Sequence, residues 1–290
     1  MGDLQGICQG DRGHERLEFM EPVRALPEDS ERKIDLGMSR ECDAIHLSLH
    51  RVKPPDRPQD KIIIALDVPD TDSALRLLDS LGEAPSIVKI GLELFTSQGP
   101  SVVKAVLDLG SRVFLDLKFH DIPNTVAHAV ASASGLGVAM ITLHASGGPV
   151  MMEAAAKAAG KSGNPDLLLL AVTVLTSMDS VQLSSTGVPV EPKEHVARLA
   201  SLAFSSGIGG IVCSPLEVAV IRSSLGNALR IVTPGVRPAW GAAGDQKRVM
   251  TPAEAVQAGS DWLVIGRPVT AAESPREAYA KIVSEISEGT

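Results

Sequence analysis

The chain has 290 residues, 44% of them hydrophobic, which is enough to bury one large core. Its formal net charge is -8 and its pI is near 5.4, which argues against nucleic acid as the main partner, because binding a phosphate backbone needs a basic field. No window approaches the ~18 to 20 consecutive apolar residues of a membrane helix, and the N-terminus lacks the layout of a signal peptide. We therefore expect a cytoplasmic protein that binds neither membranes nor nucleic acid.

The cysteines indicate neither a disulfide framework nor a metal cluster. They are three in number and far apart, at Cys8, Cys42 and Cys213. Cys42, His46 and His50 follow one another at intervals of four, which would place them on one face of a helix, but a closed zinc site needs a fourth ligand. We therefore predict no metal site and no redox chemistry.

Residues 1–58 differ in composition from the rest of the chain. They carry scattered charges without sustained periodicity and end in the proline-rich segment KPPDRP at residues 53–58. We interpret residues 1–58 as a flexible or disordered extension and residues 59–290 as one folded domain.

From residue 61 onward, two kinds of segment alternate. Short runs rich in β-branched residues are followed by amphipathic stretches such as residues 73–81 and 126–134, which predict helices. Continuous apolar strands separated by helices are typical of a parallel sheet buried on both faces. The eight predicted strands are IIIALDV from residue 62, SIVKIG from 86, RVFLDLK from 112, AMITLH from 139, LLLLAVTVL from 167, GIVCS from 210, RIVTPG from 230 and DWLVIG from 261.

Eight strand and helix units in the 230 residues from 61 to 290 match a closed barrel. A doubly wound open sheet is the alternative, but six strands are its usual number. We therefore predict an α/β protein whose single domain is a (β/α)8 TIM barrel, preceded by the flexible N-terminal extension.

Polar residues that interrupt the ends of the apolar strands are the candidate site residues. In TIM barrels the chemistry takes place at the carboxyl ends of the strands. Taken singly, each such residue has an ordinary structural explanation, such as capping the next helix. The candidates are Asp67, Lys89, Asp116, Lys118, His144, Thr176, Ser177, Arg237, Gly266 and Arg267.

Four charged residues form a group that is harder to explain structurally. Asp116 and Lys118 are two positions apart on one strand and so share a face, and Lys89 from the neighbouring strand should lie beside them. With Asp121 included, positive and negative side chains alternate in the order Lys89, Asp116, Lys118, Asp121. Unpaired charges in a barrel mouth are costly, so an array of alternating charges is the arrangement that can be tolerated there. A buried salt-bridge network without catalysis is the alternative, and Asp121 also fits a helix N-cap before Pro123. We predict a catalytic array, because perturbed charge clusters in clefts are typical of functional sites.

His144 and the last two strand ends complete the candidate site. We expect His144 to be a hydrogen-bonded residue that supports the site, because most buried histidines have that role. Backbone N–H groups at Gly266, together with Arg267, can converge on a phosphate after the eighth strand. Arg237 and the polar loop that contains Gln246 follow the seventh strand and can close over the phosphate. No GxxxxGK[ST] loop is present, so we expect a phosphate ester rather than a nucleoside triphosphate.

These segments resemble one family, the bacterial-type orotidine 5'-phosphate decarboxylases. The long string DLKFHDIPNTV at residues 116–126 is highly specific, whereas a Gly-Arg pair after the eighth strand would be weak alone. The resemblance covers residues 61–290 and does not extend to residues 1–58. At no functional position does the chain depart from the family pattern. The other shared motifs are ALD from residue 65, VKIG from 88, VTVLTSM from 172, VTPGVRP from 232, GDQKR from 244 and VIGRP from 264.

The resemblance implies a function and a role for each matching residue. The reaction is the decarboxylation of orotidine 5'-phosphate to UMP in de novo pyrimidine biosynthesis, a carboxy-lyase reaction without metal or cofactor. Lys118 looks like the proton donor to C6 of the pyrimidine, with Asp116 near the departing carboxylate and Lys89 and Asp121 completing the array. The residues that resemble the family's substrate contacts are Asp67 and Lys89 for the ribose, Thr125 in the string that lines the nucleotide site, Thr176 and Ser177 for the pyrimidine, and Arg237, Gln246, Gly266 and Arg267 for the phosphate.

The resemblance also implies a homodimer, in which Asp121 and Thr125 serve the neighbouring subunit's site. The rival enzyme is a magnesium-dependent sugar-phosphate decarboxylase or aldolase of the same superfamily, which shares an Asp-x-Lys-x-x-Asp segment. Such enzymes carry a carboxylate on the second strand, where this chain has Lys89, and a cation there disfavours Mg²⁺. A non-catalytic nucleotide-binding barrel is the rival from another class, but it does not explain an intact charge array.

Overall fold

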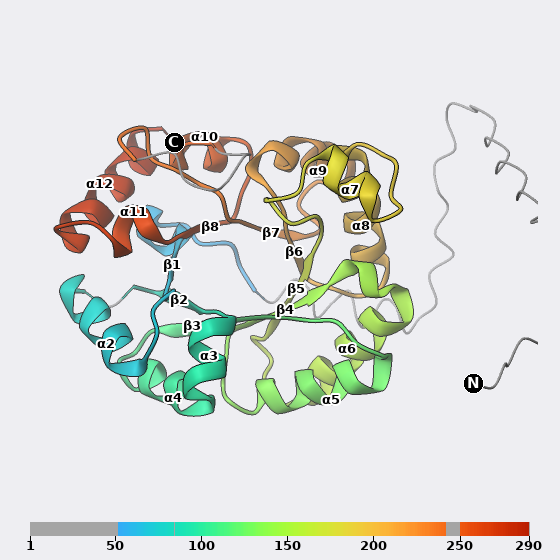
Figure 1. Ribbon diagram of the computed structural model, residues 1–290, viewed down its shortest axis with the longest axis horizontal. Helices are drawn as coiled ribbons and strands as arrows, with labels where there is room; N and C mark the ends of the chain where they lie inside the picture. The colour runs from blue at the N-terminus through green and yellow to red at the C-terminus, as the bar shows by residue number, and fades with distance from the viewer. Residues whose placement is uncertain (1–51, 84, 242–249, 290) are drawn as a thin grey trace, which may run out of the picture. The chain divides into compact units, whose positions relative to one another are not determined.

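A computed structural model describes residues 52–83, 85–241 and 250–289. The described residues form a closed barrel in which each strand pairs in parallel with the next and β1 closes the ring against β8 (Figure 1). The predicted (β/α)8 barrel is therefore confirmed, and the open sheet is excluded. The strands are β1 Ile62–Ala65, β2 Ile87–Ile90, β3 Arg112–Phe119, β4 Met140–His144, β5 Leu168–Val172, β6 Gly210–Val212, β7 Arg230–Thr233 and β8 Trp262–Ile265.

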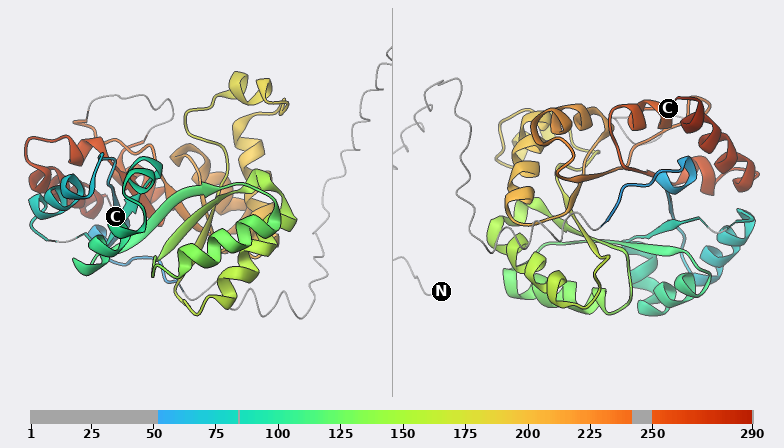
Figure 2. Two further views of the ribbon diagram at one scale, coloured as in Figure 1. Left: turned by 60° about the horizontal axis from the view of Figure 1, so that its bottom comes forward. Right: turned by 180° about the vertical axis from the view of Figure 1, so that it is seen from behind.

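Helices cover the outside of the barrel, and most of them begin with a proline at their first turn, where its missing N–H costs nothing (Figure 1). No described helix is long and apolar enough to cross a membrane. Figure 2 shows the segment after β5, which carries α7, projecting beyond the body of the barrel. The helices are η1 Pro58–Lys61, α2 Thr71–Ser80, α3 Leu92–Gln98, α4 Pro100–Asp108, α5 Pro123–Ser134, η2 Ala145–Gly147, α6 Pro149–Lys161, α7 Ser180–Ser185, α8 Pro192–Ser205, η3 Pro215–Glu217, α9 Val218–Leu225, α10 Pro252–Gln257, α11 Arg267–Thr270 and α12 Pro275–Glu288.

Two apolar clusters form the core, because alternate residues of each strand point to opposite faces. Ile62 and Ile64 belong to the cluster that also contains the helix residues, so this cluster lies between the strands and the helices. Ile63 and Phe114 belong to a second cluster of strand residues, which fills the inside of the barrel. Because the interior is filled by side chains, a site is expected at the ends of the strands.

The segment that leads into β1 touches the barrel. Val52 packs against the inner cluster, and its carbonyl accepts a hydrogen bond from Arg230 Nε at 2.9 Å. The carbonyl of Pro55 accepts another from Lys61 Nζ at 3.0 Å. The part of the predicted extension from residue 52 onward therefore contacts the domain, and residues 1–51 lie outside the described residues.

Candidate active site

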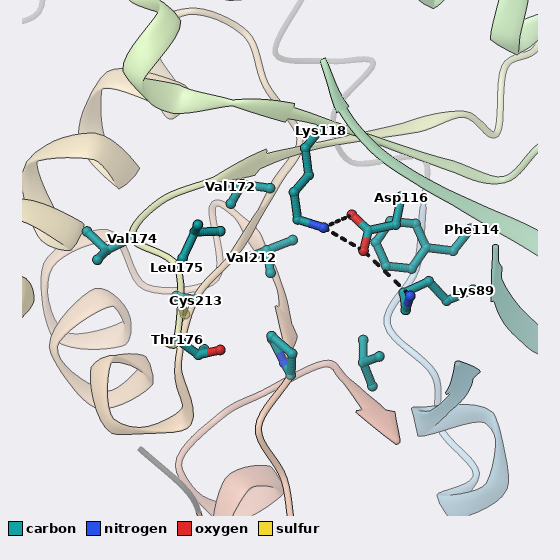
Figure 3. A pocket seen from close by; sticks show the side chains of 12 residues that line it. Lys89, Phe114, Asp116, Lys118, Val172, Val174, Leu175, Thr176, Val212 and Cys213 are labelled. Atoms are coloured by element: carbon teal, nitrogen blue, oxygen red, sulfur yellow. Dashed lines mark hydrogen bonds and ion pairs between the residues drawn. The ribbon is translucent and has the colours of Figure 1, made fainter. Parts of the chain in front are cut away.

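A cavity of about 170 Å³ lies at the carboxyl ends of the strands (Figure 3). Its polar lining comes from Lys89 on β2, from Asp116 and Lys118 on β3, and from Thr176 after β5. Residues from six strands or the loops that follow them, β2, β3, β5, β6, β7 and β8, therefore meet at one place, as the barrel predicts. The apolar wall includes Phe114, Val172, Val174, Leu175, Val212 and Val264.

Three of the four predicted array residues are in contact. Lys118 Nζ lies 2.8 Å from Asp116 Oδ1 and 2.9 Å from Asp116 Oδ2. Lys89 Nζ lies 3.8 Å from Asp116 Oδ2 and 2.9 Å from Asp67 Oδ1. Asp116 is thus shared by two cations, and the side chains of Lys89 and Asp116 are only 12% and 13% exposed (Figure 3). The signs alternate from Asp67 through Lys89 and Asp116 to Lys118.

A glycine makes room for the outer part of this array. A β-carbon at Gly91 would lie 2.9 Å from Lys89 Nζ and 3.6 Å from Asp67 Oδ1. The first distance is too short, so a larger residue would displace the ammonium group. At the other side of Asp67, Gly266 follows β8, and a β-carbon at Gly266 would lie 3.6 Å from Asp67 Oδ2. Asp67 therefore lies between the array and the predicted phosphate site.

The backbone of β3 is irregular where it carries Asp116 and Lys118. Leu115 pairs with Ile141 and Phe119 pairs with Leu143, so three residues of β3 lie opposite the single residue Thr142. Within this bulge Lys118 has a φ of 52°, and it is the one non-glycine residue with positive φ among the residues that the structure describes. Such conformations are sparsely populated, and they cluster at functional sites.

Asp121 and Thr125 lie outside this group within one chain. Both are exposed at the start of α5, and Asp121 forms no ion pair with another described residue of the chain. The capping residue of α5 is Ile122, without a side-chain cap, and the Asp121 carboxylate accepts only from the adjacent Ile122 N–H at 2.6 Å. The interpretation of Asp121 as a helix N-cap is therefore wrong, because Pro123 shifts the start of the helix by one residue.

The predicted pyrimidine contacts separate at the cavity wall. Thr176 is half-buried and lines the cavity, whereas Ser177 is exposed and is not among the lining residues. The structure therefore brings Thr176, but not Ser177, to Lys89, Asp116 and Lys118.

The predicted phosphate residues surround the ends of β7 and β8. Arg237 is half-buried, and its guanidinium donates to the carbonyl of Val236 at 3.0 Å. The backbone N–H of Arg237 donates to the carbonyl of Met250 at 2.9 Å. This bond joins the two ends of the loop that connects Arg237 to Met250. Arg267 is exposed at the first position of α11. Gln246 lies outside the described residues, so its part in a phosphate site remains a prediction.

His144 lies at the end of β4, half-buried, with its ring centroid 5.3 Å from that of His120. Burial is the main cause that lowers its pKa below the ordinary value, and the nearby His120 and Lys118 lower the pKa further. These surroundings therefore favour the neutral form of the ring. No hydrogen bond joins its ring to another described residue, which differs from the hydrogen-bonded role expected for it.

Comparison with known proteins identifies the family. The family model described as "Orotidine 5'-phosphate decarboxylase / HUMPS family" matches residues 60–282. The chain belongs to this family. The predicted resemblance is thereby confirmed.

Curated relatives match over nearly their whole length. The protein named orotidine 5'-phosphate decarboxylase of Photobacterium profundum is 50% identical over 227 residues, which are 78% of this chain and 98% of the relative. The protein of the same name from Pasteurella multocida is 51% identical, over 78% of this chain and 97% of the relative. The crystal structure of orotidine 5'-phosphate decarboxylase from Lactobacillus acidophilus matches with a TM-score of 0.68 and 39% identity, over 80% of this chain and 99% of that one.

The structure adds two residues to this decarboxylase-family site that the sequence did not indicate. Thr142 is fully buried and contacts both Asp116 and Lys118, and Cys213 is buried after β6 and lines the cavity. Threonine is common in strands, so nothing in the sequence distinguished Thr142 from a core residue. Cys213 lay within the predicted sixth strand run, where a cysteine behaves as a small hydrophobic residue.

Proposed function

We propose that this chain decarboxylates orotidine 5'-phosphate to UMP, a carboxy-lyase reaction of de novo pyrimidine biosynthesis. The observation that carries the proposal is that two ammonium groups meet one carboxylate beside the cavity. Lys118 Nζ lies 2.8 Å from Asp116 Oδ1, and Lys89 Nζ lies 3.8 Å from Asp116 Oδ2. Relatives about half identical to the chain and named orotidine 5'-phosphate decarboxylase support the same substrate.

The proposed chemistry is proton transfer driven by electrostatics. The bond between C6 and the carboxylate breaks, CO2 leaves, and the electron pair stays on C6, where the ring offers no position to delocalise it. The Lys118 ammonium faces this charge and transfers its proton to C6, which gives UMP, and the amine then regains a proton from water. A fixed cation that stabilises developing charge is most effective in a partly buried site such as this one.

Asp116 has two parts in this proposal. Its carboxylate holds the Lys118 ammonium, with both oxygens within 2.9 Å. It also lies near the carboxylate of the bound substrate, and two like charges about 4 Å apart repel by roughly 4 kcal/mol at an effective dielectric of 20. This repulsion disappears when CO2 leaves, so it favours the reaction, but it is a small share of the ~8 to 23 kcal/mol that enzymes supply.

The remaining residues bind the parts of the substrate that do not react. Binding energy from the phosphate and ribose is used to close the site around the reacting carbon. In this proposal, Asp67 and Lys89 bind the ribose, Thr125 lines the nucleotide site, Thr176 and Ser177 contact the pyrimidine, and Arg237, Gln246, Gly266 and Arg267 bind the phosphate.

We propose further that the active form is a cytoplasmic homodimer. Asp121 and Thr125 are exposed at the start of α5, and the Ile122 side chain between them is 67% exposed. An exposed apolar side chain beside a carboxylate that forms no ion pair with another described residue of the chain is compatible with contact with a second copy. Asp121 and Thr125 would then complete the neighbouring subunit's site, and Asp121 would bring the fourth charge to the array.

The proposed reaction needs neither a metal nor a cofactor. Where magnesium-dependent relatives would carry a carboxylate on the second strand, the ammonium of Lys89 is held between Asp67 and Asp116. Absorbance should therefore fall when orotidine 5'-phosphate is added to the purified protein in EDTA. Activity that EDTA abolishes and Mg²⁺ restores would contradict this part of the proposal, and no absorbance change under either condition would contradict the reaction itself.

A further inference from the structure

Thr142 on β4 is the residue that faces the irregular part of β3. Its side chain is fully buried at 0% exposure, and it is not among the residues that line the cavity. In the register of the two strands, Asp116, Leu117 and Lys118 all lie opposite this one residue. Thr142 therefore occupies the position from which one side chain reaches both members of the catalytic pair.

The hydroxyl of Thr142 makes one hydrogen bond to each of them. Thr142 Oγ1 accepts from the backbone N–H of Lys118 at 2.9 Å and donates to Asp116 Oδ1 at 3.0 Å. A hydroxyl has one donor and can accept as well, so a single group serves both partners. The same Asp116 oxygen lies 2.8 Å from Lys118 Nζ, so Thr142, Asp116 and Lys118 form a closed ring of contacts.

The Lys118 backbone needs this support. In a bulge the extra residues lose their partners in the strand ladder, and an unpaired buried N–H is costly. Lys118 also has a φ of 52°, a conformation that a residue with a β-carbon keeps only where its surroundings impose it. The Thr142 hydroxyl gives the Lys118 N–H its partner at the point where the strand pairing is interrupted.

We propose that Thr142 is a positioning residue for the reaction. Its hydroxyl fixes the bulge that aims the Lys118 ammonium into the cavity, and it holds the Asp116 carboxylate in the orientation that receives that ammonium. It touches no substrate atom, so it acts on turnover rather than on binding. This inference rests on the proposed decarboxylation, with Lys118 as the proton donor.

The test compares Thr142→Val, which keeps the shape but removes the hydroxyl, with Thr142→Ser, which keeps the hydroxyl. We expect Thr142→Val to lower kcat by about tenfold to a hundredfold, the range for lost hydrogen bonds to charged groups. KM for orotidine 5'-phosphate and the affinity for UMP should change by less than about threefold, because no substrate contact is lost. Thr142→Ser should keep kcat within about threefold of the wild type, because the same hydroxyl bonds remain possible.

Thr233→Val is the matched control. Thr233 is also a strand threonine with 0% exposure, but its hydroxyl bonds to Ser260 Oγ at 2.8 Å, and neither residue is among those that line the cavity. The control also loses the hydrogen bond of a buried threonine hydroxyl, in this case to a neutral partner, so it reports what lost stability alone does to turnover. We expect its kcat to stay within about threefold of the wild type. A kcat loss in Thr233→Val equal to that in Thr142→Val would show that stability, not positioning, controls turnover.

Each remaining outcome also decides the inference. An unchanged kcat in Thr142→Val, or an equal loss in Thr142→Val and Thr142→Ser, would overturn the role of the hydroxyl. If Thr142→Val does not fold, Thr142→Cys replaces it with the same expectation, because a thiol is a weak hydrogen-bonding group. A wild-type chain that does not decarboxylate orotidine 5'-phosphate would refute the proposed function and this inference together, whereas an active wild type with an equally active Thr142→Val refutes only this inference.

Discussion

Lys118 Nζ lies 2.8 Å from Asp116 Oδ1, although the two residues are only two positions apart on β3 and Lys118 has a left-handed backbone. The bulge turns the Lys118 side chain so that its ammonium meets both oxygens of the carboxylate. Lys89 approaches the same carboxylate from the neighbouring strand. The charge of Asp116 is therefore central to the array, and its replacement is informative.

Asp116→Asn should lower kcat by about a hundredfold or more, because the amide no longer holds the Lys118 ammonium with a charge. KM for orotidine 5'-phosphate should stay the same or fall, since the amide removes repulsion of the substrate carboxylate. Steady-state kinetics measure both values. Asp108→Asn, at an exposed carboxylate that pairs with Lys104 at 2.8 Å on α4, is the control and should keep both values. A tenfold rise in KM with unchanged kcat would mean that Asp116 only binds substrate.

The proposed phosphate-binding residues should matter mainly for a phosphorylated substrate. Arg237→Ala or Arg267→Ala should each lower kcat/KM for orotidine 5'-phosphate by about tenfold to a hundredfold, since a charge-assisted contact is worth about 1.5 to 3 kcal/mol. The double change of Arg237→Ala with Gln246→Ala should be worse than either alone. Orotidine, which lacks the phosphate, should respond much less.

An exposed arginine provides the control for these variants. Arg198 pairs with Glu194 at 3.4 Å on α8, and its side chain is 62% exposed. Arg198→Ala should leave kcat/KM for both substrates unchanged. Equal losses for orotidine and its 5'-phosphate in Arg237→Ala would indicate that Arg237 supports the fold rather than binding phosphate.

Two truncations should behave differently at the N-terminus. Removal of residues 1–51 should leave activity and Tm nearly unchanged, because their composition offers little apolar surface to dock. Removal of residues 1–58 should lower Tm, because it deletes Val52 and Pro55, which contact Arg230 and Lys61. Thermal unfolding of both truncated chains measures this difference. A large loss of Tm in the shorter truncation would place residues 1–51 in the fold, and equal Tm in both would make the contacts of residues 52–58 unimportant.

His144 should make the protein less stable in acid. Its folded-state pKa is lowered, mainly by burial, and also by His120 and Lys118, while Asp116 acts in the opposite direction. The unfolded chain therefore binds the proton more readily, so the contribution of the neutral ring is present above about pH 6.5 and is lost as pH falls through the folded-state pKa. Between pH 7 and 5, Tm of the wild type should fall more than Tm of His144→Gln.

The control for His144 is His128→Gln, an exposed position on α5. It removes one histidine without removing a buried one, so its Tm should follow the wild type across the same pH range. A His144→Gln variant whose Tm has the same pH dependence as the wild type would contradict the assigned effect of burial.

The sequence predicted the fold and most of the array for a physical reason. Apolar strands that alternate with amphipathic helices determine a parallel barrel, and that fold brings strand ends such as Lys89 and Asp116 together. It did not predict what depends on local geometry. The strand periodicity places Asp116 and Lys118 on one face, but it does not reveal the bulge, the positive φ of Lys118, or the contact with Thr142.

Two details at the ends of elements were not predicted, for the same reason. A Pro-rich segment resembles a linker in composition, yet Val52 packs against the inner cluster of the barrel. Asp121 resembles a cap before Pro123, but the helix begins at Pro123 and leaves Asp121 exposed. Both depend on where neighbouring segments lie, which composition and spacing do not specify.

The turnover of Lys118→Ala tests most directly whether Lys118 is the proton donor. We expect the variant to stay folded, to bind UMP, and to lose at least about a thousandfold in kcat, because it lacks both the proton and the charge that faces C6. Lys104→Ala, which removes an exposed lysine whose side chain is 77% exposed, should keep wild-type turnover. A folded Lys118→Ala protein that retains a tenth of the wild-type kcat would contradict the role of Lys118.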